Sequence, residues 1–162
     1  MKCLLLAGCA IFALSGTGAQ AATLAAWQGS ATFTKLAPAA SCANAGFSAG
    51  DLAHSVYRAH LNSGEPNAGI SFIGSRGATI YFDASSIPDL GGNGNYNAFL
   101  IGGRATTTSG GAPYTGTYKL KVTPATITAT TKQVTVTGTI TNFFNSTGCT
   151  ATFEASYFLR PD

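Results

Sequence analysis

Charged side chains are scarce in this sequence. Only 9% of its 162 residues are Asp, Glu, Lys or Arg, whereas an average soluble domain has about 25%. The nine basic residues are scattered along the chain and form no cluster of the kind that neutralises several phosphates. We therefore predict that the chain has no nucleic-acid partner.

Long apolar runs and helical periodicity are missing beyond residue 21. No later stretch approaches the roughly 20 apolar residues that a helix needs to span a bilayer, so we expect no membrane span. A sustained 3.6-residue period is also missing, and only residues 49–56 fit a helical turn or two. Apolar residues make up 45% of the chain and occur in short runs between Gly, Asn and Pro. This pattern is typical of strands joined by turns.

Two of these runs alternate clearly between apolar and polar residues. In residues 132–144, Val134, Val136 and Ile140 share one face while threonines occupy the other, which is the pattern of a strand with one face in water. In residues 149–159 the same alternation predicts an inward-facing set. That set is Ala151, Phe153, Ala155, Tyr157 and Leu159.

The number and spacing of the runs predict the fold class. Short strands separated by turns indicate an all-β fold, an antiparallel β-sandwich (or β-barrel) of about eight or nine short strands. No internal repeat or linker divides the chain, so we expect residues 22–162 to form a single domain. The predicted strands cover residues 30–36, 55–61, 69–74, 78–83, 97–103, 114–122, 125–131, 132–144 and 149–159.

The first 21 residues have the features of a cleavable signal peptide. Lys2 provides the positive charge, residues 3–14 form the apolar core, and residues 19–21 (Ala-Gln-Ala) match the small-residue cleavage site. We therefore expect a secreted or periplasmic protein. Residues 6–9 (Leu-Ala-Gly-Cys) also match a bacterial lipobox, with Cys9 as the lipid-bearing residue, and this alternative stays open.

Two cysteines remain once Cys3 and Cys9 leave with the signal peptide. In an oxidising compartment an even pair favours a disulfide, so we predict a bond between Cys42 and Cys149. A loop of that length corresponds to about 4–5 kcal/mol of stabilisation as an upper figure. The two cysteines have no neighbouring histidines or carboxylates, so we expect no metal site, and nothing indicates a cofactor.

One motif raises an enzymatic alternative. Residues 46–50 (Gly-Phe-Ser-Ala-Gly) match the G-x-S-x-G nucleophile pattern, which makes Ser48 and His54 the weak catalytic candidates. That motif has mechanical meaning only on a tight turn between a strand and a helix, and the chain shows no strand–helix alternation. His54 and His60 would lie roughly 20 Å apart along one strand, too far to share a zinc ion.

A stretch rich in glycine and asparagine is the weak candidate for ligand binding. Such residues mark ordinary turns because they accept left-handed conformations. Their oxygens also suit contact with a polar ligand or calcium, although the bidentate glutamate of a calcium loop is missing. Asn145 begins a glycosylation sequon, which is used only if the source has a eukaryotic secretory pathway. The ligand candidates are Asp89, Asn93, Asn95, Tyr96 and Asn97.

Two segments resemble the chaperone–usher pilins. Residues 29–42 (GSATFTKLAPAASC) are similar to the opening strand of these subunits, which leads to a cysteine. Residues 149–159 (CTATFEASYFL) are similar to their closing strand, which carries a tyrosine. The resemblance implies an incomplete immunoglobulin-like sandwich that a neighbour completes by donating a strand. The two cysteines here are further apart in sequence than those of the pilin bridge.

These observations favour a non-catalytic function. We predict a secreted or periplasmic β-sandwich that acts through surface contacts, as a structural, adhesion or ligand-binding module. A protein or a glycan surface is the partner that such a module would contact. The alternatives are an exported hydrolase and a pilin-like subunit that assembles by strand exchange.

Overall fold

The computed structural model describes residues 24–60, 68–73, 77–82, 92–101 and 113–160. Strands dominate it, as predicted, and none of its helices is long and apolar enough to cross a membrane. The one α-helical turn lies at Ala39–Cys42 rather than within residues 49–56. The elements are β1 (Leu24–Ala37), α1 (Ala39–Cys42), β2 (Leu52–His60), β3 (Ala68–Ile73), β4 (Gly77–Phe82), β5 (Gly92–Ile101), β6 (Pro113–Thr123), β7 (Gln133–Thr141), the 3-10 turn η2 (Phe143–Asn145) and β8 (Thr150–Leu159).

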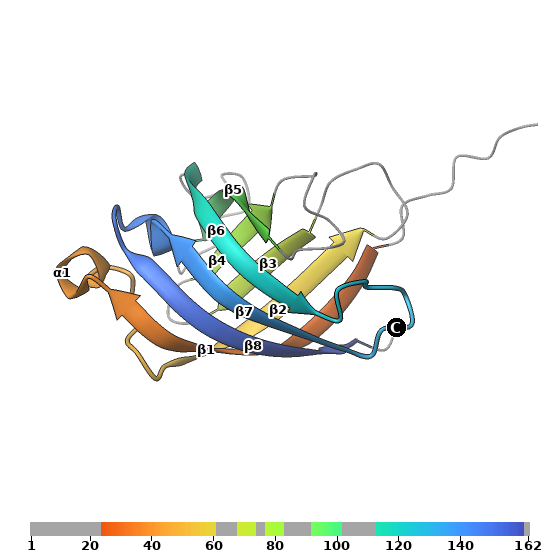
Figure 1. Cartoon of the computed structure of the whole chain (residues 1–162). Coiled ribbons are helices and arrows are strands. Elements are labelled where there is room, and N and C mark those ends of the chain that lie inside the picture. Colours follow the sequence, from red (N-terminus) through yellow and green to blue (C-terminus); the bar gives the residue numbers. More distant parts are fainter. Residues whose placement is uncertain (1–23, 61–67, 74–76, 83–91, 102–112, 161–162) are drawn as a thin grey trace, which may run out of the picture.

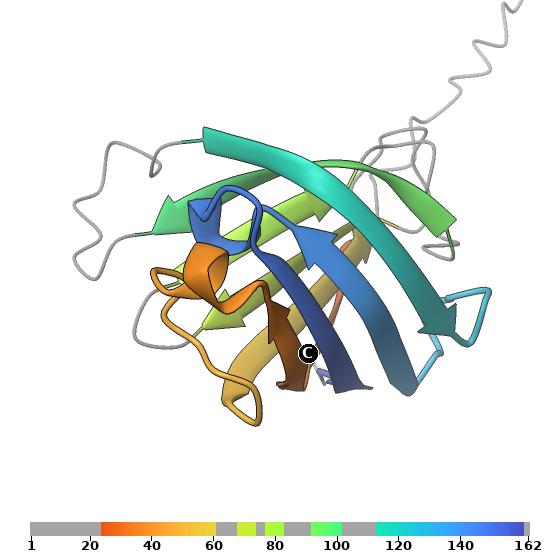
Figure 2. The same cartoon turned by 60° about the vertical axis from the view of Figure 1, so that its left-hand side comes forward.

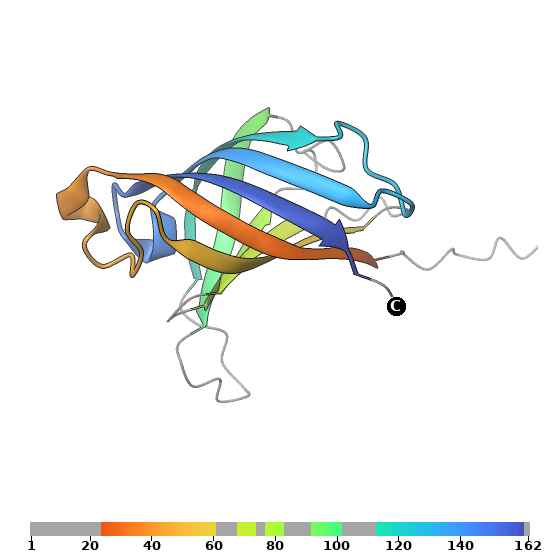
Figure 3. The same cartoon turned by 90° about the horizontal axis from the view of Figure 1, so that it is seen from below.

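The eight strands form one closed antiparallel barrel. Each strand pairs with the next in sequence, and β8 returns to pair with β1 (Figures 1 and 3). The sandwich that we placed first is therefore not the arrangement adopted. Closure depends on β1, which is 14 residues long and pairs with β2 over 24–32 and with β8 over 27–37. A register shift between Phe33 and Lys35 marks a bulge, which bends the strand as closure requires.

One predicted strand does not form and another begins earlier than predicted, each for an identifiable reason. Residues 125–131 form the connection between β6 and β7, where the Thr128 N–H donates to Thr131 Oγ1 at 2.9 Å and the Thr131 N–H donates to the Thr128 carbonyl at 3.0 Å. Threonine hydroxyls thus close a turn in place of a ladder. Strand β5 begins at Gly92 rather than at residue 97, because its Gly- and Asn-rich start pairs with β6.

The described inward-facing side chains fill the barrel. The alternation predicted for β7 and β8 is confirmed, since Val134, Val136, Ile140 and the inward set of β8 from Ala151 to Tyr157 are buried. Large aromatic residues alternate with alanines. Several of these aromatic side chains have no solvent-accessible surface. The interior beside them is therefore a packed core, as the size of an eight-stranded barrel allows. The fully buried aromatic residues are Trp27, Phe33, Tyr57, Phe72, Phe143, Phe153 and Tyr157.

One end of the barrel is closed by the predicted disulfide. Cys42 in α1 is bonded to Cys149, which directly precedes β8, and their Cα atoms lie 4.8 Å apart. Figure 2 shows α1 beside η2 at this end. Beneath them the Phe33 ring packs against Phe47 and Phe143, with ring centroids 4.7 and 4.9 Å away. The covalent bond and the aromatic cluster together hold α1 and η2, which we call the cap, on this end of the barrel.

Candidate functional site

A polar groove of about 420 Å³ lies on the outer face of β5, β6 and β7. Strand pairing builds it in two rows. Lys119 lies between Asn93 and Thr139 in the first row, and Thr117 is opposite Asn95 in the second. These side chains point outward because their sequence neighbours Tyr118 and Ile140 are buried. The lining residues are Asn93, Gly94, Asn95, Thr117, Tyr118, Lys119, Thr139 and Thr141.

Side-chain hydrogen bonds hold the second row of the groove in place. The backbone ladder between β6 and β7 ends at the pair Tyr118 and Ile140. Beyond it, the Thr117 N–H donates to Thr141 Oγ1 at 2.8 Å, and the two threonine hydroxyls lie 3.0 Å apart. The side chain of Thr141 therefore continues the strand pairing where the backbone no longer does, and it fixes this wall of the groove.

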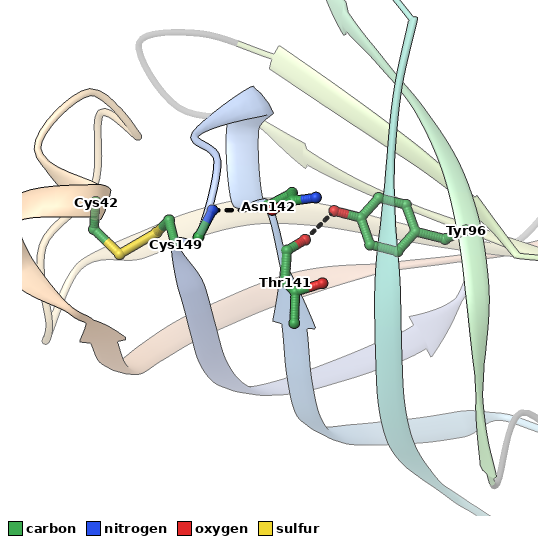
Figure 4. The surroundings of a disulfide bond; sticks show 6 residues. Cys42, Tyr96, Thr141, Asn142 and Cys149 are labelled. Carbon is green, nitrogen blue, oxygen red and sulfur yellow. Dashed lines mark hydrogen bonds between the residues drawn. A yellow bond between two sulfur atoms is a disulfide. The ribbon is translucent and has the colours of Figure 1, made fainter.

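The same wall is tied to the disulfide-bonded turn through Asn142. Its backbone is left-handed, with φ 52°, a conformation that asparagine accepts more readily than most residues. Its amide nitrogen donates to the Thr115 carbonyl at 3.0 Å, and its amide oxygen accepts from the Gly148 N–H at 3.0 Å. Gly148 directly precedes Cys149, so the contacts connect the groove to the cap (Figure 4).

Tyr96 supports the groove from inside the barrel. Its hydroxyl donates to the carbonyl oxygen of Thr141 (Figure 4). The ring lies against Gly116, where an added Cβ would stand 2.5 Å from the Thr141 carbonyl oxygen and 2.6 Å from the Tyr96 ring. Burial, together with the neighbouring Tyr114, raises the pKa of Tyr96, so the phenol remains a protonated donor. The sequence analysis proposed Tyr96 as a ligand contact, but the structure directs it away from the groove.

The other ligand candidates are divided between the groove and its surroundings. Asn93 and Asn95 line the groove, and both are exposed. Asn97 is exposed on the same outer face, opposite Thr115, but it is not part of the lining. Asp89 lies outside the described residues. The sequence analysis missed Thr117, Lys119, Thr139 and Thr141, because their proximity to the asparagines depends on the register of three strands.

Lys119 is the charged group of the groove. It is exposed, and no salt bridge within the described part of the chain involves it or Lys121, the next outward residue on β6. The remaining polar groups of the lining are side-chain amides and hydroxyls, which both donate and accept hydrogen bonds. The groove thus combines neutral hydrogen-bonding groups with one positive charge that no described carboxylate pairs with.

The two catalytic candidates lie on different parts of the fold. Ser48 lies in the connection between α1 and β2, not on a turn from a strand into a helix. Its N–H donates to Asp51 Oδ2 at 2.7 Å, and the Asp51 N–H donates to the Ser48 carbonyl at 3.1 Å. The carboxylate therefore closes a local turn, and no hydrogen bond joins Ser48 to His54, which is exposed on β2. The two glycines of the motif, Gly46 and Gly50, have φ of 77° and 95°, so they allow the loop to adopt a positive-φ backbone.

The structure also bears on metal binding and on the glycosylation sequon. Within the described ranges, no group of three or more His, Cys, Asp or Glu side chains could hold a metal ion. Asn145, which begins the sequon, is exposed at the end of η2 and has a φ of 58°.

No protein-family model, curated protein or solved structure gives a significant match to this chain. The chemistry of the groove is therefore what indicates a function.

Proposed function

We propose that this chain is an exported, non-catalytic binding protein that recognises a glycan through the groove on β5, β6 and β7. The observation that carries the proposal is the lining of that groove. Its volume of about 420 Å³ lies within the range of small-molecule sites, roughly 300–1,000 Å³. Its amides and hydroxyls match the alternating donors and acceptors of sugar hydroxyls.

The packed interior supports a site on the outer surface. Barrels of this size either fill their interior with side chains or hold one small ligand there. Trp27, Tyr57, Phe72 and Tyr157 have no accessible surface, so no water-sized space lies beside them. A ligand at these positions would have to displace core side chains, whereas the groove is open without rearrangement.

The disulfide supports export. Stable disulfides form in oxidising compartments and are rare in the cytosol. The bond between Cys42 and Cys149 is thus consistent with an extracytoplasmic location. The signal-peptide pattern of residues 1–21 favours the same location, although those residues lie outside the described ranges.

The closed barrel disfavours assembly by strand exchange. A pilin-like subunit needs an open sheet edge to accept a donated strand. Here β1 is hydrogen-bonded to β2 on one side and to β8 on the other, and each of the other described strands also has two neighbours. A donated strand would first have to displace one that is already paired.

A comparison of two asparagines on β5 tests the proposal. Asn95 lines the groove and Asn97 does not, although both are exposed on the same face of one strand. Binding to a panel of oligosaccharides is measured for the native protein by calorimetry, and the best binder is then measured with N95A and N97A. We expect N95A to weaken binding about tenfold, the value of one or two lost hydrogen bonds, and N97A to leave it unchanged. Binding of no glycan, or equal losses in both variants, would refute the proposal.

A further inference from the structure

The charges beside the groove carry information about the ligand. Lys119 and Lys121 are both exposed on the outer face of β6, two residues apart, and neither is engaged in a salt bridge with a described residue. Alternate residues of a strand lie about 6.6–6.8 Å apart on one face. The outer face of β6 therefore presents two ammonium groups in line, one inside the groove and one beyond it, and no described carboxylate pairs with either.

The surrounding acidic groups do not neutralise this pair. Glu154 is the nearest acidic residue in the described register, since Lys121 is opposite Thr137, which is in turn opposite Glu154 on β8. Two strand spacings, roughly 9–10 Å, separate the backbones of Lys121 and Glu154, and no salt bridge joins these two described side chains. Among the described residues, no carboxylate lines the groove. The described charges on the outer face of β6 are therefore both positive, in a chain that has few charges overall.

The neutral partners define the shape of the recognised group. Asn93 and Thr139 flank Lys119 on the neighbouring strands, so an anion at Lys119 would also receive hydrogen bonds from an amide or a hydroxyl. A lysine acts as a point charge, and the groove lacks the arginine fork that favours dianionic phosphate. One ammonium group among neutral donors suits a group with a single negative charge.

Resting on the glycan-binding function proposed above, we infer that the ligand is an acidic oligosaccharide whose sugar units carry carboxylates. The chain of sugars lies along β6. One carboxylate is held at Lys119 between Asn93 and Thr139, and the hydroxyls of that unit bond to Asn95 and Thr117. The next acidic unit reaches Lys121 outside the groove.

Three ligands separate the acidic inference from the proposed function. Binding of the full chain is measured by calorimetry with three ligands. They are a uronic-acid tetrasaccharide, the same tetrasaccharide after reduction of its carboxylates to alcohols, and a tetrasaccharide that carries sulfate esters and no carboxylates. We expect the uronate to bind at least tenfold more tightly than the reduced form, as hydrogen bonds to a charged group are worth more than neutral ones. Equal affinity for the two would overturn the inference and leave the proposed function standing. Tighter binding of the sulfated sugar would overturn the choice of a carboxylate, and binding of none of the three would count against both.

Three methionine variants locate the charge recognition. Methionine retains an unbranched apolar stem and removes the charge. We expect K119M to lower the ratio of the affinities for the uronate and for its reduced form about tenfold or more, and K121M to lower it less. K132M should leave that ratio unchanged, because Lys132 precedes β7 outside the groove. All three residues are exposed, so the variants should have the same melting temperature as the native protein. An equal effect of K132M and K119M would show attraction to net charge and would overturn the assignment.

Discussion

Replacing Gly116 with alanine should destabilise the barrel through a single added methyl group. The new Cβ would lie 2.5 Å from the carbonyl oxygen of Thr141 and 2.6 Å from the ring and hydroxyl of Tyr96. Backbone cannot move aside as a flexible side chain does, so the ring must shift and the hydrogen bond between Tyr96 and Thr141 must break.

The expected cost has two parts. Overpacking of a well-packed site costs about 1–3 kcal/mol. A buried phenol that loses its partner costs about 1–3 kcal/mol more. Together they predict that G116A lowers the free energy of unfolding by about 2–6 kcal/mol. For a domain of this size each kcal/mol corresponds to roughly 3–4 °C in Tm, so the melting temperature should fall by roughly 6–24 °C.

Chemical denaturation and thermal melting measure this cost, and two further variants identify its cause. In G94A the three heavy atoms nearest to the added Cβ all belong to the side chain of Tyr118, at 3.0–3.1 Å. A small shift of that side chain relieves the contact, so we expect a loss below about 1 kcal/mol. In a Y96F background G116A should cost about 1 kcal/mol less than in the native chain, because no hydroxyl remains to lose its partner. A G116A protein as stable as the native one would refute the close packing described here. An unchanged cost in Y96F would refute the role of the hydrogen bond.

Two further predictions concern the buried tyrosines. Within the described residues the buried Tyr57 hydroxyl has no hydrogen-bond partner, whereas that of Tyr157 lies 2.9 Å from Ser55 Oγ. We expect Y57F to match or exceed the native stability in urea denaturation and Y157F to lose about 1 kcal/mol; the opposite order would contradict this pairing. Burial raises the pKa of Tyr57, and it raises the pKa of Tyr114 to about 12, from the usual 10.0 of a tyrosine. The folded state then holds these protons more tightly than the unfolded chain, so stability is full below pH 10 and declines between about pH 10 and 12. Tyrosinate absorbance should therefore rise together with loss of the far-UV circular dichroism signal, and gradual titration near pH 10 in a folded protein would contradict it.

Local alternation predicted the strands better than it predicted how they assemble. Val134 to Ile140 and Ala151 to Tyr157 face inward as expected, because a period of two with one buried face leaves no other choice. A sandwich and a barrel impose the same alternation on every strand. Only the pairing of β1 with β8 distinguishes them, and that contact joins residues at opposite ends of the domain.

The start of β5 shows why local propensity was misleading. Gly92, Asn93 and Gly94 suggest a turn when considered alone, since these residues are depleted in strands. In the structure Gly94 is opposite Tyr118, and its missing side chain leaves space for the tyrosine ring. An aromatic residue across from a strand glycine compensates for its poor propensity. The tertiary partner therefore decides the conformation of this segment.

Only the part of the candidate site that lies on one strand was predicted from the sequence. Asn93 and Asn95 were identified because they are polar residues in one short stretch. Lys119 and Thr139 lie more than twenty residues further along, and only the register of β5, β6 and β7 brings them alongside. The disulfide was the long-range contact that could be predicted, because just two cysteines follow residue 21.

The seam between β1 and β8 also bears on edge-to-edge aggregation of this chain. Proteins usually protect exposed sheet edges with charged side chains, and here only 9% of the residues are charged. A closed ring of strands makes that protection unnecessary, since each described strand has a partner on both sides. At Gly29 the two backbones of the seam lie so close that a Cβ would stand 1.8 Å from the Ser156 carbonyl oxygen. Opening the seam there would expose the edges of two long strands at once, and each strand has a single charged residue, Lys35 or Glu154. This line of contact therefore protects the chain against edge-to-edge aggregation.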